Sequence, residues 1–267
     1  MATKKSNNQT TNDTKAKAFA AREAAEKQEK RRERFVRVGL VIGVLIVVGG
    51  IIGGALLATN KNDAKANTTT NSALPTGVTK ENPGTSVGTA QTPNIELFED
   101  FQCPACAGVE KAYGVTFNNL VNAGKAKITY YPMDFLDNNL GNDSSSRAAS
   151  AFGCAVDAGK AEAYHAVVFK NQPTQEGTGY TQEQLKQFGK DAGITGPAYD
   201  KFASCVDNLT YNGWGKTVNT YATSRGVKAT PTIFVNGQLL PRESMGSEQQ
   251  LLAEIQKLAG SPASPAP

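Results

Sequence analysis

The stretch Phe101–Cys106 (FQCPAC) decides how the rest of the sequence is interpreted. It follows directly on a short apolar run, Ile95–Phe101 (IELFEDF), and apolar residues at helical spacing continue after it as far as Ala123. A β-rich run, Lys127–Met133 (KITYYPM), comes next, and its Pro132 restricts the pairing of that strand. The order strand, helix, strand predicts a βαβ unit with both cysteines at its first strand-to-helix junction.

This junction gives the two cysteines different chemistry. We expect Cys103 at the N-cap of the helix and Pro104 in its first turn, where proline is tolerated. The unpaired N–H groups and the positive end of the helix then stabilise a thiolate on Cys103 and lower its pKa. Cys106 lies one turn further on the same face and can attack a mixed disulfide formed on Cys103. The spacing therefore predicts a two-step thiol–disulfide exchange.

A metal site and an inert structural disulfide are the other interpretations of the motif. A four-cysteine zinc site needs a second CxxC, whereas Cys154 and Cys205 are far apart in the sequence. Haem attachment needs a His after the second cysteine, where this chain has Ala107. The single His of the chain also excludes a multi-His metal site. We expect no metal and no other cofactor. A permanent structural disulfide between Cys103 and Cys106 is the remaining alternative.

The sequence continues with an Ala-rich helical stretch and a hairpin. Thr230–Leu240 is typical of a strand, an Asn-Gly type I′ turn and a second strand, and Ser247–Leu258 predicts a closing helix. Thr181 provides a start signal close to a capping box. The helices expected before the hairpin are Ser144–Ala158, Ala161–Lys170, Thr181–Ala192 and Ala198–Arg225, the last of them broken near Gly213.

The N-terminal region has a different character. Residues 1–37 hold 11 of the 28 basic side chains but only 5 of the 24 acidic ones, which predicts a basic cytoplasmic segment. Residues 38–58 are 21 uncharged residues, enough for a transmembrane helix through a hydrocarbon core of about 30 Å. The positive-inside rule places the rest of the chain outside the cell. A cleaved signal peptide is the alternative, although its charged and apolar parts would both be unusually long.

Two further segments show no apolar periodicity. Residues 59–92 are rich in Asn, Thr, Gly, Ser and Pro and predict a flexible linker, and residues 260–267 predict a disordered tail. Residues 93–259 are then the folded domain, which is large enough for one core. Because the basic excess belongs to residues 1–37, this domain lacks the charge that favours nucleic-acid binding.

The FQCPAC motif, the helical stretch and Thr230-Pro231 before the hairpin together resemble the DsbA family of thioredoxin-fold oxidoreductases. The similarity is greatest to membrane-anchored or exported forms of actinobacteria and covers nearly all of the expected domain. It implies a thioredoxin-like α/β fold with a helical domain inserted at about residues 140–226. It also implies that Cys103 is the nucleophile and that Cys106 is the resolving partner.

Further residues belong to the active site that this resemblance implies. Thr230-Pro231 is expected as a cis bond beside the cysteines, which leaves its backbone free to pair with an extended substrate. Enterobacterial relatives have a His between the cysteines, whereas this chain has Pro104 and Ala105, which implies a less stabilised thiolate and a less oxidising enzyme. Glu99 and Asp100 are candidates for an acidic residue that assists proton movement, or else are solvated strand-end carboxylates.

The helical stretch holds the other cysteines, the His and the Trp. Cys154 and Cys205 are the two cysteines outside the motif, and an even number of cysteines in an exported protein suggests that they pair. The resemblance to actinobacterial relatives with a second bridge also favours a structural disulfide between them. Closing that loop would contribute on the order of 4 kcal/mol in the chain-entropy model. Two buried free thiols and a redox relay pair are the alternatives. His165 and Trp214 are expected in the core.

One main function and two alternatives follow. The main expectation is a single-pass protein of the cell membrane with a cytoplasmic N-terminus. Its extracytoplasmic domain would form disulfides in exported proteins that carry reduced cysteines, and a quinone-linked membrane reoxidase of the VKOR or DsbB type would reoxidise it. The alternatives are a disulfide reductase or isomerase of the same fold, and a non-catalytic module that binds extended peptides.

Overall fold

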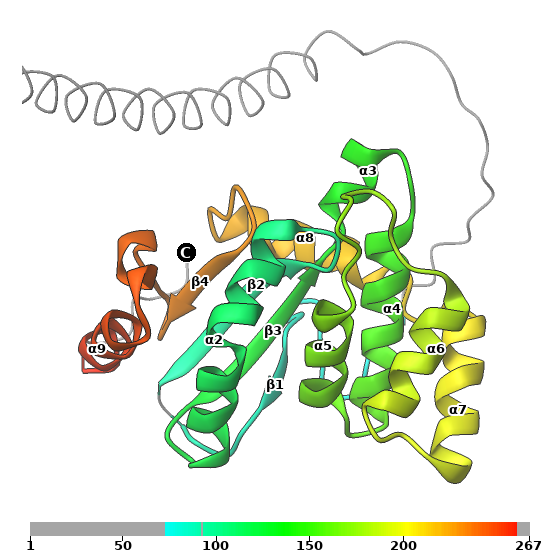
Figure 1. Ribbon diagram of the computed structural model, residues 1–267, viewed down its shortest axis with the longest axis horizontal. Coiled ribbons are helices and arrows are strands. Elements are labelled where there is room, and N and C mark those ends of the chain that lie inside the picture. The colour runs from blue at the N-terminus through cyan, green and yellow to red at the C-terminus, as the bar shows by residue number, and fades with distance from the viewer. Residues whose placement is uncertain (1–72, 92, 261–267) are drawn as a thin grey trace, which may run out of the picture. The chain divides into compact units, whose positions relative to one another are not determined.

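The computed structural model describes residues 73–91 and 93–260, which form a five-stranded sheet with helices around it (Figure 1). The strand order is β1-β3-β2-β4-β5, with β2 parallel to β3 and all other neighbours antiparallel. Helix α2 (Pro104–Asn122) connects β2 to β3, which confirms the predicted βαβ unit. The strands are β1 (Thr85–Val87), β2 (Asn94–Asp100), β3 (Lys127–Met133), β4 (Thr232–Val235) and β5 (Gln238–Leu239).

Helices cover both faces of the sheet, with α2 in front of it and α8 behind it in Figure 1. The Thr116 hydroxyl of α2 donates a 2.6 Å hydrogen bond to the first residue of α9 (Glu248–Ala259), so these two helices share a face. On the other face, Tyr221 of α8 (Trp214–Ser224) stacks near Phe98 of β2 at a centroid distance of 6.3 Å. Nearly all of β2 is buried, as expected for a central strand between two layers.

The helical insert lies between β3 and β4 and mostly to one side of the sheet (Figure 1). Helix α6 begins directly after Thr181, whose side chain forms the predicted capping box with Gln184. The break predicted near Gly213 in the stretch 198–225 is confirmed, because residues 208–213 separate two helices there. The insert also starts slightly earlier than predicted, because the short helix α3 precedes it. Its helices are α3 (Phe135–Leu140), α4 (Ser144–Asp157), α5 (Ala161–Lys170), α6 (Gln182–Asp191), α7 (Gly196–Asp207) and α8.

The hairpin and the C-terminal helix follow the predicted pattern. Asn236 and Gly237 connect β4 to β5 with φ angles of +50° and +76°, the left-handed values that a type I′ turn requires. A short 3₁₀ helix, η1 (Arg242–Gly246), precedes α9. Helix α9 is capped by the Ser247 hydroxyl, which accepts a hydrogen bond from the backbone N–H of Gln250.

The folded unit begins before residue 93, so the predicted linker 59–92 is wrong for its described part. Strand β1 pairs with β3, and the indole N–H of Trp214 donates a 2.7 Å hydrogen bond to the carbonyl of Pro83. Val78 is buried as well. A three-residue edge strand carries too little alternation to be found in the sequence, and its stability comes from pairing with β3.

The predicted basic segment 1–37, the transmembrane helix 38–58, the first part of the linker and residues 261–267 lie outside the described residues. Among the helices that the structure describes, none has the length and apolar character needed to span a bilayer.

A disulfide bond joins Cys154 of α4 to Cys205 of α7, within the helical insert. Cys103 and Cys106 are free thiols, so the structure corresponds to the reduced form of the motif. Trp214 is fully buried and stacks on Phe152 at a centroid distance of 5.7 Å, as expected for a core residue.

Candidate active site

Cys103 is the N-cap residue of α2, and Pro104 is the first residue of the helix, as the sequence predicts. The backbone at Cys103 is extended (φ −75°, ψ 116°), and its N–H donates a 2.9 Å hydrogen bond to the carbonyl of Asp100. One turn further along the helix, Cys106 is completely buried. The strand-to-helix turn thus places one thiol at the start of the helix and the other beneath it.

The two thiols have opposite pKa shifts. A hydrogen bond from the Cys106 thiol, helped by the backbone N–H groups of Cys106 and Ala105, lowers the pKa of Cys103 to about 6 although burial opposes this. Burial raises the pKa of Cys106 well above its ordinary value, and its hydrogen bond to Cys103 and the charge of Glu99 act in the same direction. At neutral pH, Cys103 is therefore a thiolate and Cys106 a thiol.

Cys103 is less accessible than an outward-facing helix end would suggest. Only 7% of it is exposed, whereas Pro104 and Ala105 are exposed. The Gln172 side chain, from the segment after α5, donates hydrogen bonds to the carbonyls of Phe101 (2.8 Å) and Cys103 (3.0 Å). The two residues between the cysteines therefore form the solvent-facing border of the site.

Thr230-Pro231 is a cis peptide bond, as the resemblance implied, and it lies against the motif. The Cys103 sulfur is 3.6 Å from the carbonyl oxygen of Thr230. The Thr230 hydroxyl is buried beside the Cys103 sulfur. Because this hydroxyl can donate to an ionised sulfur, it also contributes to the lowered pKa of Cys103.

The two candidate acids have different surroundings. Glu99 is buried, and burial followed by the charge of Cys103 raises its pKa to about 8. The charge of Glu99 in turn raises the pKa of Cys106, so this carboxyl interacts electrostatically with both cysteines. The alternative of a solvated carboxylate is wrong for Glu99, because both faces of the sheet are covered.

Asp100 is also buried, but it stabilises the turn that leads into α2. Its carboxylate accepts hydrogen bonds from the N–H of Gln102 (2.9 Å), the N–H of Leu136 (3.1 Å) and the hydroxyl of Ser145 (2.6 Å). Burial raises its pKa to about 7. These bonds connect the end of β2 to α3 and α4, a role that sequence analysis did not predict.

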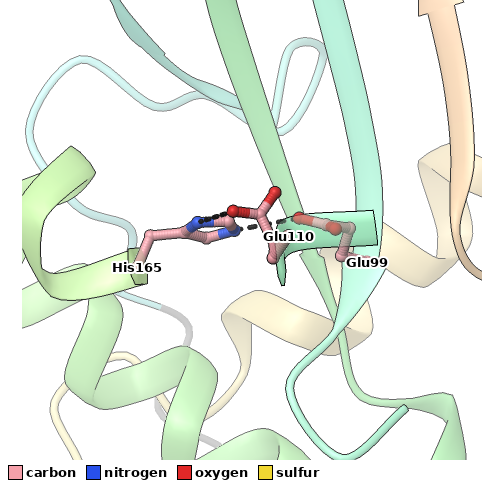
Figure 2. A group of neighbouring side chains, drawn as sticks. All are labelled: Glu99, Glu110 and His165. Atoms are coloured by element: carbon pink, nitrogen blue, oxygen red, sulfur yellow. Dashed lines mark hydrogen bonds and ion pairs between the residues drawn. The ribbon is translucent and has the colours of Figure 1, made fainter. Parts of the chain in front are cut away.

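Sequence analysis also missed Glu110 and the polar contacts of His165. His165 is buried as expected and packs against Tyr130 at a centroid distance of 4.3 Å. Its Nε2 lies 2.9 Å from Glu99 Oε2, and its Nδ1 lies 3.7 Å from Glu110 Oε2 (Figure 2). The position of Glu110, four residues after Cys106 on the same helix, was the signal that could have revealed it.

Glu99, Glu110 and His165 each offer one ligand atom, and these atoms lie within 4.8 Å of one another. Each ring nitrogen of His165, however, has a different carboxylate as its nearest partner. These two contacts of the ring also suit the passage of a proton through the imidazole from one carboxyl group to the other.

A pocket of about 610 Å³ lies between α2 and α5 and begins at Pro104 of the motif. Glu110 and Gln172 are among its lining residues, together with the apolar side chains of Phe169 and Val115. Val115 is 75% exposed, so the pocket opens to solvent. Through Glu110, the pocket brings solvent next to a side chain that contacts His165.

The chain belongs to the thioredoxin family, because the family model described as Thioredoxin matches residues 80–257. This range contains the motif, the helical insert and the cis bond, and it begins before β1, which agrees with the early start of the folded unit.

Three solved structures of thiol-disulfide oxidoreductases are similar to this chain. MdbA, a thiol-disulfide oxidoreductase from Actinomyces oris, is 20% identical with a TM-score of 0.58, over 69% of this chain and 92% of that chain. Reduced DsbA from Mycobacterium tuberculosis is 26% identical with a TM-score of 0.54, over 67% and 93%. DsbG from the same organism, a disulfide bond oxidoreductase in its reduced form, is 25% identical with a TM-score of 0.53, over 71% and 94%. No match was found among curated proteins.

Proposed function

We propose that this protein is an extracytoplasmic thiol:disulfide oxidoreductase that forms disulfide bonds in exported proteins. The observation that carries the proposal is the opposite behaviour of two thiols one helical turn apart, with a pKa of about 6 for Cys103 and a strongly raised pKa for Cys106. Exchange needs one sulfur that leaves readily as a thiolate and a second that is kept protonated until it is required.

The proposed cycle starts from a disulfide between Cys103 and Cys106. A substrate thiolate attacks the Cys103 sulfur, the bond between the cysteines breaks, and Cys106 leaves as a thiolate that takes up a proton. A second substrate thiolate then attacks the substrate sulfur of the mixed disulfide, and Cys103 leaves as a thiolate. The substrate loses two electrons, which the reduced cysteine pair holds until an oxidant removes them.

Glu99 is the proposed source of the proton for Cys106. Its raised pKa of about 8 means that it still carries a proton at neutral pH. A carboxyl group whose pKa lies near the working pH can both give and recover a proton, which is the requirement for general acid–base catalysis.

The direction of the reaction is proposed as oxidation. A thiolate with a lowered pKa stabilises the reduced enzyme, so exchange with a substrate dithiol favours oxidised substrate and reduced enzyme. The similarity to DsbA and DsbG from Mycobacterium tuberculosis, at 26% and 25% identity, supports the same activity.

The proposed location and partners rest on the sequence pattern. The uncharged residues 38–58, preceded by the basic residues 1–37, would hold the protein in the cell membrane with its catalytic domain outside. Substrates would be exported proteins with reduced cysteines, and the electrons would pass to a quinone-linked reoxidase of the VKOR or DsbB type. A C-terminal tag that proteases reach in intact cells would support this orientation.

The activity is tested by the oxidative refolding of a substrate protein whose native disulfides have first been reduced. The oxidised wild-type protein should accelerate refolding, and Cys103→Ser should abolish the acceleration. Cys106→Ser should abolish the acceleration as well, because the variant cannot form the disulfide that starts the cycle. When it is mixed instead with a substrate that already contains disulfides, the Cys103 thiolate should attack one of them, and the mixed disulfide should accumulate because no partner thiol releases it. Equal refolding rates with wild type and Cys103→Ser would overturn the proposal.

The reduction potential of the cysteine pair separates oxidase from reductase. An equilibrium with glutathione should give a value in the range of about −120 to −180 mV, as for oxidising members of the fold. A value near −270 mV, typical of a reducing thioredoxin, would favour the reductase instead.

A further inference from the structure

Three ionisable side chains near the cysteines form no bonds to sulfur, although one of them, Glu99, is the proposed proton source for Cys106. Glu99, His165 and Glu110 come from β2, α5 and α2 and form a cluster, in which each ring nitrogen of His165 has a different carboxyl group as its nearest partner (Figure 2). Glu99 and His165 are 4% and 3% exposed, whereas Glu110 lines the pocket between α2 and α5. The cluster therefore contacts a solvent-accessible pocket through Glu110, while Glu99 and His165 are enclosed.

We propose that His165 and Glu110 form a proton pathway between Glu99 and this pocket. The inference rests on the proposed function, because a proton must reach Cys106 whenever the disulfide opens and must leave when it closes. Glu99 is enclosed and can exchange only a single proton with Cys106. A second turnover requires a route by which Glu99 regains or loses that proton.

The protonation states suit such a route. Burial lowers the pKa of His165, so the ring is neutral and carries one proton on one of its two nitrogens. Burial raises the pKa of Glu110 to about 7, so this carboxyl exchanges protons near neutral pH. The other titratable groups that interact electrostatically with this cluster are Cys103, Cys106, Tyr130 and Glu162. Tyr130 stays neutral, because burial raises its pKa strongly.

The proton balance closes over one catalytic cycle. When Cys106 leaves as a thiolate, it takes the proton of Glu99, His165 donates its Nε2 proton to Glu99, and Nδ1 takes a proton from Glu110. Glu110 is then protonated from the pocket. Reoxidation removes the proton from Cys106 and runs these steps in reverse, which returns the ring proton to Nε2. One proton therefore enters through the cluster when the cysteine pair is reduced and one leaves when it is reoxidised, and no electron passes through the cluster.

The gap between His165 and Glu110 requires a small movement. Their 3.7 Å separation exceeds the hydrogen-bond range of about 2.7–3.2 Å, so the Glu110 carboxyl must approach the ring. Glu110 Oε1 is buried and has no hydrogen-bond partner within the described residues, as is also true of Glu99 Oε1. Because that oxygen is not held by another group, rotation of the Glu110 carboxyl can close the gap.

The test follows the reduction of the oxidised, full-length protein by excess dithiothreitol in H₂O and in D₂O, with the ultraviolet absorbance of the thiolate as the signal. Glu110→Gln and His165→Gln should each slow reduction about tenfold, less than the loss of about 10²–10⁴ expected for a group that transfers the proton directly. Both should also show a larger slowing in D₂O than the wild type. Lys111→Ala, in the same pocket and on the same helix, is the matched control and should react at the wild-type rate.

Chemical rescue separates a proton pathway from a structural role. Glu110→Ala leaves space at the pocket, so added formate should restore much of its rate while leaving Lys111→Ala unchanged. Wild-type rates and isotope effects in Glu110→Gln, or a slow Glu110→Ala that formate does not restore, would overturn the pathway. Neither result would affect the proposed function, which fails separately if the wild-type protein does not accelerate refolding.

Discussion

At the scale of single residues, the charge on one sulfur is set by its immediate neighbours. The Cys106 thiol makes the largest contribution to the lowered pKa of Cys103, and the Thr230 hydroxyl and the N–H groups at the start of α2 add to it against the effect of burial. The sequence predicted the contribution of the helix end. It did not predict that the partner thiol would contribute more, because that depends on the distance between two side chains.

Removing the partner thiol should therefore raise the pKa of Cys103. In Cys106→Ala, the titration of thiolate absorbance should shift from about 6 toward the ordinary value of about 8.5, and Thr230→Val should shift it by a smaller amount in the same direction. Cys103→Ser supplies the control, because the low titration should disappear from it. An unchanged midpoint in Cys106→Ala would show that the helix end alone holds the charge.

The buried carboxyl of Glu99 should make stability depend on pH. Its pKa is about 4.3 in an unfolded chain and about 8 in the folded protein, so the folded state binds more protons between these values. The free energy of unfolding should then fall as pH rises from about 5 to 8, and Glu99→Gln should flatten this slope. Urea unfolding of the oxidised protein measures it, because the disulfide prevents the cysteines from titrating. The charge of Cys103 is then absent and burial alone raises the pKa of Glu99, so the slope should end at a somewhat lower pH than in the reduced form.

Glu110 and Asp100 have raised pKa values of about 7, so they should leave part of that slope in Glu99→Gln. Glu254→Gln, in α9, provides a control and should keep the full slope. If Glu99→Gln also keeps the full slope, the Glu99 carboxyl is not protonated in the folded protein at neutral pH.

At the scale of elements, the helical insert is held together by the bond between α4 and α7. The double variant Cys154→Ser/Cys205→Ser should lose about 2–4 kcal/mol of unfolding free energy, because the unfolded chain gains the entropy of an open loop. The pKa of Cys103 should be unchanged in it, since α2 and the cis bond belong to the sheet part of the fold. A shifted pKa would show that the insert positions the active site through this bond.

Elements with strong local signals could be predicted from the sequence, and those defined by tertiary contacts could not. The Asn236-Gly237 turn and the capping box at Thr181 were predicted because each depends on a few adjacent residues. Strand β1 was missed because only its pairing with β3 defines it. The contact between His165 and Glu110 was missed for the same reason, since only the fold brings α5 and α2 together.

At the scale of the whole molecule, the start of the folded unit decides which part of the chain can function alone. A chain that begins at residue 73 keeps β1 and the hydrogen bond from Trp214 to Pro83, whereas one that begins at residue 93 loses both. The longer chain should keep the refolding activity and the low pKa of Cys103. The shorter chain should be less stable by at least the cost of about 1–3 kcal/mol for a buried N–H without a partner.

Urea unfolding of the two truncated chains, with Trp214 fluorescence as the probe, measures this difference directly. Trp214→Phe in the longer chain is the matched control, because it removes the N–H donor while β1 stays in place, and circular dichroism replaces fluorescence for it. It should lose less stability than the chain that begins at residue 93, since β3 keeps its edge partner. Equal stability of both truncated chains would place residues 73–92 outside the cooperative unit and return the boundary to residue 93.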